Sequence, residues 1–486
     1  MPCAPALRLS TANDAPLRPE GRHVLYWMTA ARRTTHSYAL DHAVARAREL
    51  VKPIIVLEAL RCDYPWASDR FHAFVLAGMR DNAARFARAR VAYHPYVEPA
   101  LGAGKGLLEA LAADACLVVG DEYPCFFLPR MQAAAAARLP VRFERVDGNG
   151  IIPLRANPRT FTTANSFRRH LFKIATPFLG EHPLVDPLAR LDLPPTVIPA
   201  EILRRWPRAD DALLRADLTA LARLPIDHTV APCGAGGSLA ADRLLAAFVQ
   251  HIEAYDEDRN SPEKHATSGL SPHLHFGHIG AHQIFHALAR PHAARKRPAK
   301  APARGERAAF WGVRPEAEGF ADQLVTWREL GFNMCFHRPD DYDQYDSLPP
   351  WARTTLATHA RDPRSPHYTL AQLASAATYD KLWNAAQRQL TRDGIIHNYL
   401  RMLWGKKILE WSPSPQAALA AMIELNNRYA LDGRDPNSYN GIFWVLGRYD
   451  RAWGPERPIF GKIRYMSSDN TARKVRVREY IADHAA

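Results

Sequence analysis

The chain has 486 residues, 47% of them hydrophobic and 23% charged, and no apolar run approaches the length of a membrane span. This composition is that of a soluble globular protein with room for two or three domains, and it excludes a membrane-spanning one. Lys and Arg total 63 against 50 Asp and Glu, a net charge of +13 that favours a polyanionic partner such as nucleic acid, although GC-rich coding alone can produce an arginine-rich chain.

The first 21 residues read as a loop, which we expect to be frayed. They lack the charged and then apolar pattern of a secretion signal. The six cysteines are scattered without C-x-x-C spacing. We therefore expect a reducing, cytoplasmic setting, no disulfide framework and no cysteine metal site.

From residue 22 short apolar strands alternate with amphipathic helices. Helices are expected at 37–51 and 69–89, and strands at 23–29, 53–60, 90–97, 115–123 and 141–148. This alternation is typical of a doubly wound parallel α/β domain, expected over 21–176, which binds ligands at the carboxyl ends of its strands. Neither G-x-G-x-x-G nor a Walker A sequence is present, so dinucleotide or ATP binding of those kinds is not supported.

The second half of the chain changes character. Proline-rich sequence over 177–240 predicts a connector packed on the surface rather than a third domain. From 241 to 486 long helical patterns replace the strands, and eight of the eleven tryptophans lie there, so we expect an all-α domain. The basic stretch 289–307 is expected to be a surface insertion that could touch phosphates non-specifically.

This half carries six motifs in a fixed order: SGLSPHLHFGHI (268–279), LVTWREL (324–330), LWNAAQ (382–387), LRMLWGKKILEW (400–411), LDGRDPNSYNG (431–441) and RPIFGKIRYM (457–466). Together they resemble the class II photolyases, flavoenzymes that use light to repair cyclobutane pyrimidine dimers. The α/β half resembles that family's antenna domain more weakly. The resemblance implies FAD, active as FADH⁻, a possible deazaflavin or folate antenna, UV-damaged DNA as partner, a nucleoid-associated monomer with no obligatory protein partner, and the activity of a deoxyribodipyrimidine photolyase.

Two tryptophans, Trp404 and Trp411, stand seven residues apart in an otherwise ordinary helical pattern, with Lys406 and Lys407 expected to face outward. The two rings would share one helix face about 10 Å apart along the axis. Each ring alone is typical of core filling. The resemblance implies instead an electron relay of Trp404, Trp383 and Trp411, in that order outward from the flavin, although spacing alone does not choose which of Trp383 and Trp404 is nearest.

Flavin contacts are implied by the resemblance at Tyr255 and along Thr267, Ser268, Gly269, Leu270 and Ser271. Serine hydroxyls and exposed amides suit a pyrophosphate, whereas a serine before Pro272 also fits helix capping, and both roles can hold. Asn384 and Gln387 are expected to line the same pocket. The histidines His273 and His275 would point to different faces of a helix, so no metal site is expected.

The pair Arg401 and Asp432 matches a buried salt bridge over the flavin ring, where the arginine stabilises the anionic reduced form. A surface ion pair of little energetic value is the alternative. Asn426 matches the residue expected near flavin N5. Asn398 and Asn437 are weaker candidates.

For the lesion, Trp327 and Trp444 match two aromatic residues that stack against a flipped-out dimer, and Met402 matches a residue beneath it. The basic residues that match the DNA-gripping region are Arg451, Lys462 and Arg464. A solvated basic surface is the alternative for each of the three.

Three stretches depart from the family pattern. Gln323 in FADQL (320–324) replaces the second glutamate of FLEEL, GRYD (447–450) is one residue shorter than usual with Tyr449 for histidine, and THSYAL (35–40) replaces DNWAL. The first two changes touch the lesion side and the third the antenna domain. Three functions therefore stay open: a working photolyase, a cryptochrome-like photoreceptor that signals without repair, and a flavin-binding, DNA-associated protein with neither activity.

Overall fold

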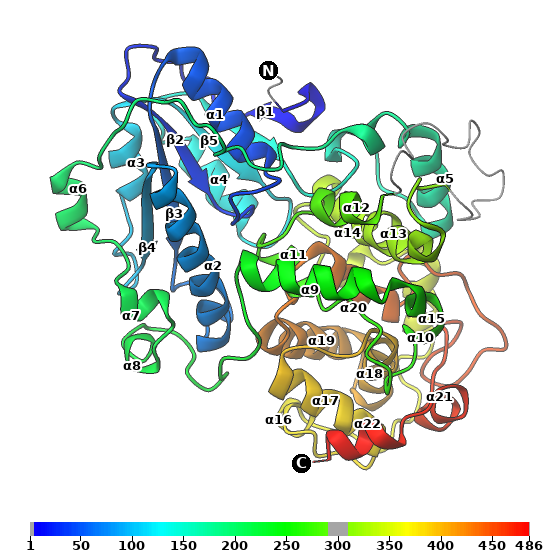
Figure 1. The fold of residues 1–486 in the computed structure, drawn as a ribbon. Helices are drawn as coiled ribbons and strands as arrows, with labels where there is room; N and C mark the ends of the chain where they lie inside the picture. Colours follow the sequence, from blue (N-terminus) through cyan, green and yellow to red (C-terminus); the bar gives the residue numbers. More distant parts are fainter. Residues whose placement is uncertain (1–3, 290–309, 486) are drawn as a thin grey trace. The chain divides into compact units, whose positions relative to one another are not determined.

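A computed structural model describes residues 4–289 and 310–485 (Figure 1). Contacts between residues divide the chain into two compact units. A sheet unit consists of Met1–Pro158, Pro177–Ala247 and Gly269–Ala287, and a helical unit of Arg159–Thr176, Phe248–Ser268 and Leu288–Ala486. Nearly all of the predicted basic insertion at 289–307 lies outside the described residues.

These units differ from the predicted domain boundaries. The proline-rich segment 177–240 groups with the sheet unit and contributes three short α-helices, and residues 269–287 group with that unit as well. Residues 159–176 group with the helical unit instead. Periodicity in a sequence reports the type of element, but it does not report which core the element packs against.

The sheet unit is built on a six-stranded sheet in the order β1-β6-β5-β2-β3-β4. All five predicted strands are present within two residues at either end, and they are parallel to one another. Their bounds are β2 His23–Met28, β3 Ile54–Leu60, β4 Ala92–Val97, β5 Ala115–Glu122 and β6 Phe143–Asp147. The strand order reverses between β2 and β5, which confirms the doubly wound topology.

The opening segment, expected to be a frayed loop, was predicted wrongly over part of its length. Strand β1 (Leu9–Thr11) pairs antiparallel with β6, and the buried guanidinium of Arg8 donates hydrogen bonds to the carbonyl oxygens of Asp147, Gly150 and Ile151. A strand of three residues carries no readable alternation, and the partners of Arg8 lie far along the chain.

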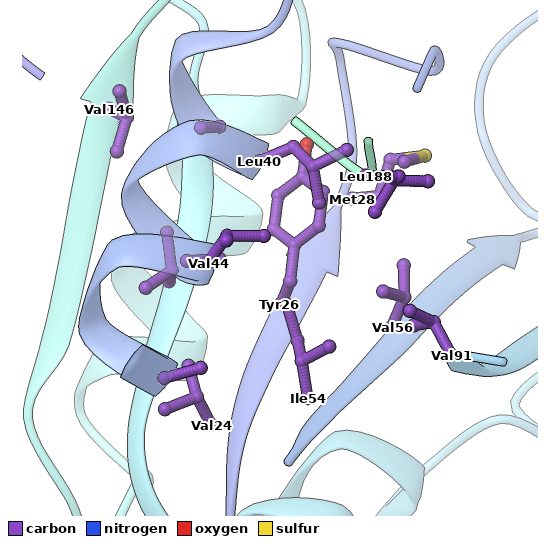
Figure 2. Packing of buried hydrophobic residues seen from close by; sticks show 14 of the residues in the cluster. Val24, Tyr26, Met28, Leu40, Val44, Ile54, Val56, Val91, Val146 and Leu188 are labelled. Atoms are coloured by element: carbon purple, nitrogen blue, oxygen red, sulfur yellow. The ribbon is translucent and has the colours of Figure 1, made fainter. Parts of the chain in front are cut away.

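Strand side chains alternate between two apolar cores. From β2, Val24 and Tyr26 point into the core covered by α1 (Tyr38–Leu50), where Figure 2 shows Tyr26 among Leu40, Val44 and neighbouring side chains. The intervening residues of β2 enter the core on the opposite face. Burial on both faces explains why these strands read as continuous apolar runs.

The loop after β2 closes over the carboxyl ends of the central strands. Asp121 in β5 accepts hydrogen bonds from the backbone N–H groups of Thr29, Ala30 and Ala31 at 2.7–2.9 Å, and its other oxygen accepts from the Tyr26 hydroxyl at 2.8 Å. The amides at this switch point are therefore satisfied by the protein's own carboxylate. These N–H groups are therefore not free to bind a phosphate, which agrees with the absence of a G-x-G-x-x-G or Walker A motif from the sequence.

The remaining helices of the sheet unit include one predicted nearly to the residue, α2, expected over 69–89. Their bounds are α2 Asp69–Arg88, α3 Leu107–Ala112, α4 Leu128–Ala136, α6 Ala200–Arg205, α7 Asp211–Leu214, α8 Leu218–Leu221, α9 Ser238–Gln250, α11 Ser271–His275 and α12 Ala281–Leu288. The last three residues of α9 and the last residue of α12 belong to segments assigned to the helical unit.

In the helical unit the described residues form helices and loops and no regular β-strand, as predicted. Its elements are α5 Ala164–Ile174, α10 Tyr255–Asp258, α13 Glu318–Asp322, the π-helix η7 Gln323–Trp327, α14 Arg328–His337, α15 Pro350–Thr358, α16 Leu370–Ala374, α17 Lys381–Asp393, α18 Asn398–Trp411, α19 Pro415–Tyr429, α20 Pro436–Val445, α21 Ser468–Lys474 and α22 Arg478–Asp483. Within the described parts of the chain, no helix combines the length and apolar character needed to cross a membrane.

Between Leu403 and Leu409 helix α18 is buried on every side, because it packs against α17, α19 and α20. The prediction that Lys406 and Lys407 face outward was therefore wrong: they are 1% and 5% exposed. The Lys406 ammonium group donates to the carbonyl oxygen of Val445 at the end of α20, and burial lowers the pKa of Lys406 to about 7. Lys407 forms ion pairs with Glu410 at 3.0 Å and with Asp380 at 3.7 Å.

Candidate active site in the helical unit

Two tryptophans predicted to stack on a lesion lie side by side. Trp327, at the end of η7, and Trp444 in α20 have ring centroids 5.3 Å apart with planes tilted by 53°. Both rings are only partly buried. Helices α14 and α20 approach closely enough for this because Gly331 has no side chain: a Cβ there would lie 2.4 Å from the carbonyl oxygen of Pro436.

Gln323, the residue that departs from the family glutamate, lies beside the same ring. With its amide oxygen turned toward them, it accepts hydrogen bonds from Arg259 Nη1 at 3.0 Å and from the Trp327 indole N–H at 3.1 Å. An amide makes such contacts without carrying a negative charge. Met402, predicted to lie beneath the lesion, is partly buried on α18.

The three relay candidates also come together, all of them buried. Trp383 in α17 and Trp411 at the end of α18 have ring centroids 5.3 Å apart, nearly edge to face. The Trp383 indole N–H donates to the backbone carbonyl of Trp404 at 3.0 Å. The Trp404 indole N–H donates in turn to Oε1 of Gln387 at 2.8 Å. Trp383 thus bridges the two tryptophans that stand seven residues apart.

The sequence analysis did not predict the residues that surround the Trp411 ring. Trp411 is 1% exposed, and its edge contacts are Tyr368 and Tyr379, at centroid distances of 5.2 and 5.8 Å. Tyr379 is 61% exposed. The ammonium group of Lys407 lies 5.4 Å from the centroid of the Trp411 ring. None of these neighbours stands at helical spacing from Trp411, apart from Lys407 itself.

A charged and polar cluster forms around Arg401 on α18. Its Nη2 lies 3.1 and 3.2 Å from the two carboxylate oxygens of Asp432, and its Nη1 lies 3.4 Å from Oδ1 of Asn426 on α19. The Arg401 and Asp432 side chains are 18% and 15% exposed, so the pair is largely buried rather than a surface ion pair. Asn426 is held in place by donating to Ser438 Oγ at 2.8 Å.

Other predicted flavin contacts are exposed or have local partners. Asn384 accepts from and donates to Thr378, which closes the turn before α17. Asn398 and Asn437 are exposed at the starts of α18 and α20. Tyr255 is buried, with its ring edge-on to Phe320 at 5.1 Å.

The predicted phosphate segment crosses the division between the units, with Thr267 and Ser268 in the helical unit and Gly269, Leu270 and Ser271 in the sheet unit. Gly269 has φ +65°, a backbone conformation that favours glycine. Leu270, not a serine, stands at the N-cap of α11. Ser271 is instead the first residue of that helix.

The three basic residues of the predicted DNA-gripping region are exposed. The guanidinium carbons of Arg451 and Arg464 lie 4.6 and 5.2 Å from the ring centroid of Trp453, and Lys462 forms an ion pair with Glu456 at 3.4 Å. Stacking against one indole holds the two arginines at the surface while leaving their charge accessible.

The fold belongs to a known architecture. The structure is similar to that of a bacterial class III photolyase from Agrobacterium tumefaciens, with a TM-score of 0.66 and 16% identity over 96% of this chain and 86% of that one. A doubly wound α/β sheet unit and a helical unit give the chain the fold of the photolyases and cryptochromes, as the sequence predicted.

Sequence similarity identifies the family within that class. The chain is 34% identical to the deoxyribodipyrimidine photo-lyase of Methanothermobacter thermautotrophicus over 98% of this chain and 97% of the relative. It is 35% identical to the enzyme of that name from Oryza sativa subsp. japonica, with coverages of 95% and 87%, and 32% identical to the one from Arabidopsis thaliana, with coverages of 94% and 88%. The chain belongs to the deoxyribodipyrimidine photo-lyase family. No family model matches the sequence.

Membership confirms the prediction of a photolyase and the prediction that the chain is an enzyme. It also supports light-dependent repair of DNA as the general activity, with damaged DNA as the partner.

Proposed function

We propose that this photolyase splits cyclobutane pyrimidine dimers in DNA by light-driven electron transfer, as a class II enzyme. The observation that carries the proposal is the pair of partly exposed rings, Trp327 and Trp444, 5.3 Å apart. Two flat apolar walls suit the fused pyrimidines of a dimer that has been flipped out of the duplex. A photoreceptor that signals to a protein partner has no need of such a pair.

FAD is the cofactor we propose, and the donor set around Arg401 fits it. A largely buried guanidinium, oriented by the Asp432 carboxylate and adjacent to the Asn426 amide, is suited to an anionic ring system. When bound in its reduced form, FAD supplies an electron on excitation by light and takes it back after the dimer has opened. The Arg401 guanidinium would stabilise the negative charge of the reduced flavin ring. Asp432 would keep the guanidinium oriented toward that ring.

We further propose that Trp404, Trp383 and Trp411 supply the electrons that bring the cofactor to its reduced state. Support comes from the edge-to-face contact of Trp383 with Trp411 and from the hydrogen bond that links Trp383 to Trp404. The Gln387 oxygen accepts from the Trp404 indole N–H and would stabilise positive charge on that ring when it loses an electron.

DNA binding is proposed at the exposed basic residues Arg451, Lys462 and Arg464, whose charge would act on phosphates without reading sequence. An antenna chromophore, a deazaflavin or a folate, stays an open alternative. In the altered THSYAL stretch the Tyr38 ring is buried, edge-on to His282 at 5.1 Å and beneath the guanidinium of Arg8 at 4.6 Å.

The test is repair of a defined substrate by purified protein carrying reduced flavin. Oligothymidine containing cyclobutane dimers should be restored under blue light and stay unrepaired in darkness. Intact dimers after illumination, combined with normal photoreduction of oxidised flavin, would favour the photoreceptor alternative, which the missing carboxylate at Gln323 makes worth testing.

A further inference from the structure

We propose that Asp322, which stands in the FADQL stretch, and Arg168, which lies outside every motif of the site, are positioning residues for Trp327 and thereby set how tightly a pyrimidine dimer is held. The inference rests on the proposed function, because it takes Trp327 to be a wall of the lesion pocket. The inference concerns the contacts that keep the partly exposed Trp327 ring in one orientation.

Asp322, the last residue of α13, is 1% exposed, and all of its hydrogen bonds go to side chains around the ring. Its Oδ1 accepts from Arg168 Nε at 3.1 Å and from the Thr326 hydroxyl at 2.7 Å. Its Oδ2 accepts from Arg168 Nη2 at 2.7 Å and from the Trp327 indole N–H at 3.0 Å. The carboxylate is therefore paired with a bidentate arginine and with the indole at once.

The local helix geometry makes the contact with the indole possible. Residues 323–327 form a π-helix, whose wider turn places residues five apart above one another. Asp322 and Trp327 are five residues apart, so the carboxylate reaches the indole N–H of its own helix. In a regular α-helix the residue above Asp322 would be Thr326 instead.

Arg168 contributes a second restraint from outside this helix. It stands on α5, and its guanidinium carbon lies 5.2 Å from the centroid of the Trp327 ring, within the range of a cation–π contact. The indole N–H is thus shared between Asp322 and, with its amide oxygen turned toward the ring, Gln323, and the ring is contacted by Arg168, while the Trp444 ring lies 5.3 Å away.

The position of Asp322 next to Gln323 raises the question whether its carboxylate stands in for the usual glutamate. Asp322 is a carboxylate one residue before Gln323, but its charge is neutralised by Arg168, and both of its oxygens are engaged inside the protein. It therefore does not replace the missing negative charge next to the lesion. What it provides is a fixed ring, and a preorganised wall loses less entropy when it binds the dimer.

The test compares two substitutions with a matched control. Asp322→Asn keeps the shape but loses the charge that holds Arg168. Arg168→Lys keeps the charge but loses the bidentate geometry. Asp341→Asn, which breaks another Arg–Asp pair of the helical unit, the one with Arg338, is the control. The readouts are the dark Kd for dimer-containing and undamaged duplexes, and the indole N–H NMR signal of Trp327, assigned by its loss in Trp327→Phe.

We expect Asp322→Asn to raise the Kd for dimer-containing DNA by roughly tenfold and Arg168→Lys by a smaller factor, with unchanged affinity for undamaged DNA. In both variants, but not in Asp341→Asn, the Trp327 indole signal should shift and its N–H should exchange faster with solvent. A merely structural role would lower stability without changing the ratio of the two Kd values.

Wild-type affinity for dimers together with an unmoved indole signal in folded Asp322→Asn overturns the proposal. If Asp322→Asn fails to fold, the same two readouts on Arg168→Lys decide. If the wild-type protein itself does not prefer dimer-containing DNA, the proposed function fails. The indole signal then still tells whether Asp322 and Arg168 position Trp327.

Discussion

The indole N–H of Trp383 donates to the backbone carbonyl of Trp404, and the Trp383 ring lies 5.3 Å from that of Trp411. One residue of α17 therefore contacts both tryptophans of α18, Trp411 at its ring and Trp404 at its backbone carbonyl. If the three rings form the proposed relay, removing one of them should interrupt photoreduction of the flavin but not repair by enzyme that is already reduced.

Trp404→Phe tests this directly. We expect photoreduction of oxidised FAD to slow by at least about tenfold, the factor that about 1.4 kcal/mol of added barrier produces, with repair by pre-reduced enzyme largely intact. Transient absorption measures the first rate and an illuminated dimer assay the second. Trp311→Phe is the control, since Trp311 is an equally buried ring packed against Phe172 and Phe310. Equal loss of both activities in Trp404→Phe would contradict the relay.

Gln387 should matter through its hydrogen bond to Trp404. Gln387→Met removes the acceptor and leaves a buried indole N–H unpaired, which should lower the free energy of unfolding by about 1–3 kcal/mol and slow photoreduction. Urea denaturation measures the first effect. In a Trp404→Phe background, where no indole N–H is present, the same substitution should cost clearly less. An equal cost in both backgrounds would mean that the hydrogen bond is not the cause.

Lys406 should give the protein a distinctive pH dependence. Its pKa in the folded state, about 7, lies below that of the unfolded chain, so between pH 7 and about 10 the unfolded state binds more protons than the folded state. The free energy of unfolding of the wild type, measured relative to Lys406→Met, should therefore rise with pH in this window, by at most about 1.4 kcal/mol per pH unit. A difference between the two proteins that does not change with pH would show that Lys406 stays charged.

Gln323→Glu restores the carboxylate usual in the family. It would face Arg259 and the indole N–H of Trp327, both of which are donors, so the pocket can accept the charge. We expect a higher yield of repaired dimers per absorbed photon. Gln344→Glu makes the same charge change at an exposed position and should leave the yield unaltered. No rise in Gln323→Glu would mean that this chain does not depend on a carboxylate at that position.

Arg464→Ala tests the proposed role of the basic residues in DNA binding. Because the side chain is exposed and would contact phosphate rather than bases, dimer-containing and undamaged duplexes should lose affinity by a similar factor, and the slope of log K against log salt should fall by about 1. Arg392→Ala, at an exposed arginine of α17, is the control. A loss confined to dimer-containing DNA would place Arg464 in the lesion pocket instead.

Features that depend on neighbouring residues in the sequence were predictable, and features that depend on contacts between distant residues were not. Strands such as β2 and helices such as α2 were predicted nearly to the residue, because burial repeats along a few consecutive residues. The three-residue strand β1 was missed for lack of any repeat. Lys406 was predicted to face the solvent, because lysine side chains are usually exposed. It is buried because α17, α19 and α20 pack around α18.

The residues of the candidate site show the same difference between local motifs and distant contacts. Trp327, Trp444, Arg401 and Asp432 stand in motifs and were predicted, and the structure brings each pair together. Arg168 was missed because its partner Asp322 lies 154 residues away in the chain, and no local pattern records such a contact. Gln387 was predicted as a pocket residue, but its contact with the Trp404 indole depends on how α17 and α18 pack.

The most direct measurement follows the ultraviolet absorbance of dimer-containing oligothymidine mixed with the reduced protein, in blue light and in darkness. The thymine absorbance should recover only in the light, and Trp444→Ala should reduce the recovery at low substrate concentration. No recovery in the light by folded protein that contains reduced flavin would contradict the assignment of dimer repair to this chain.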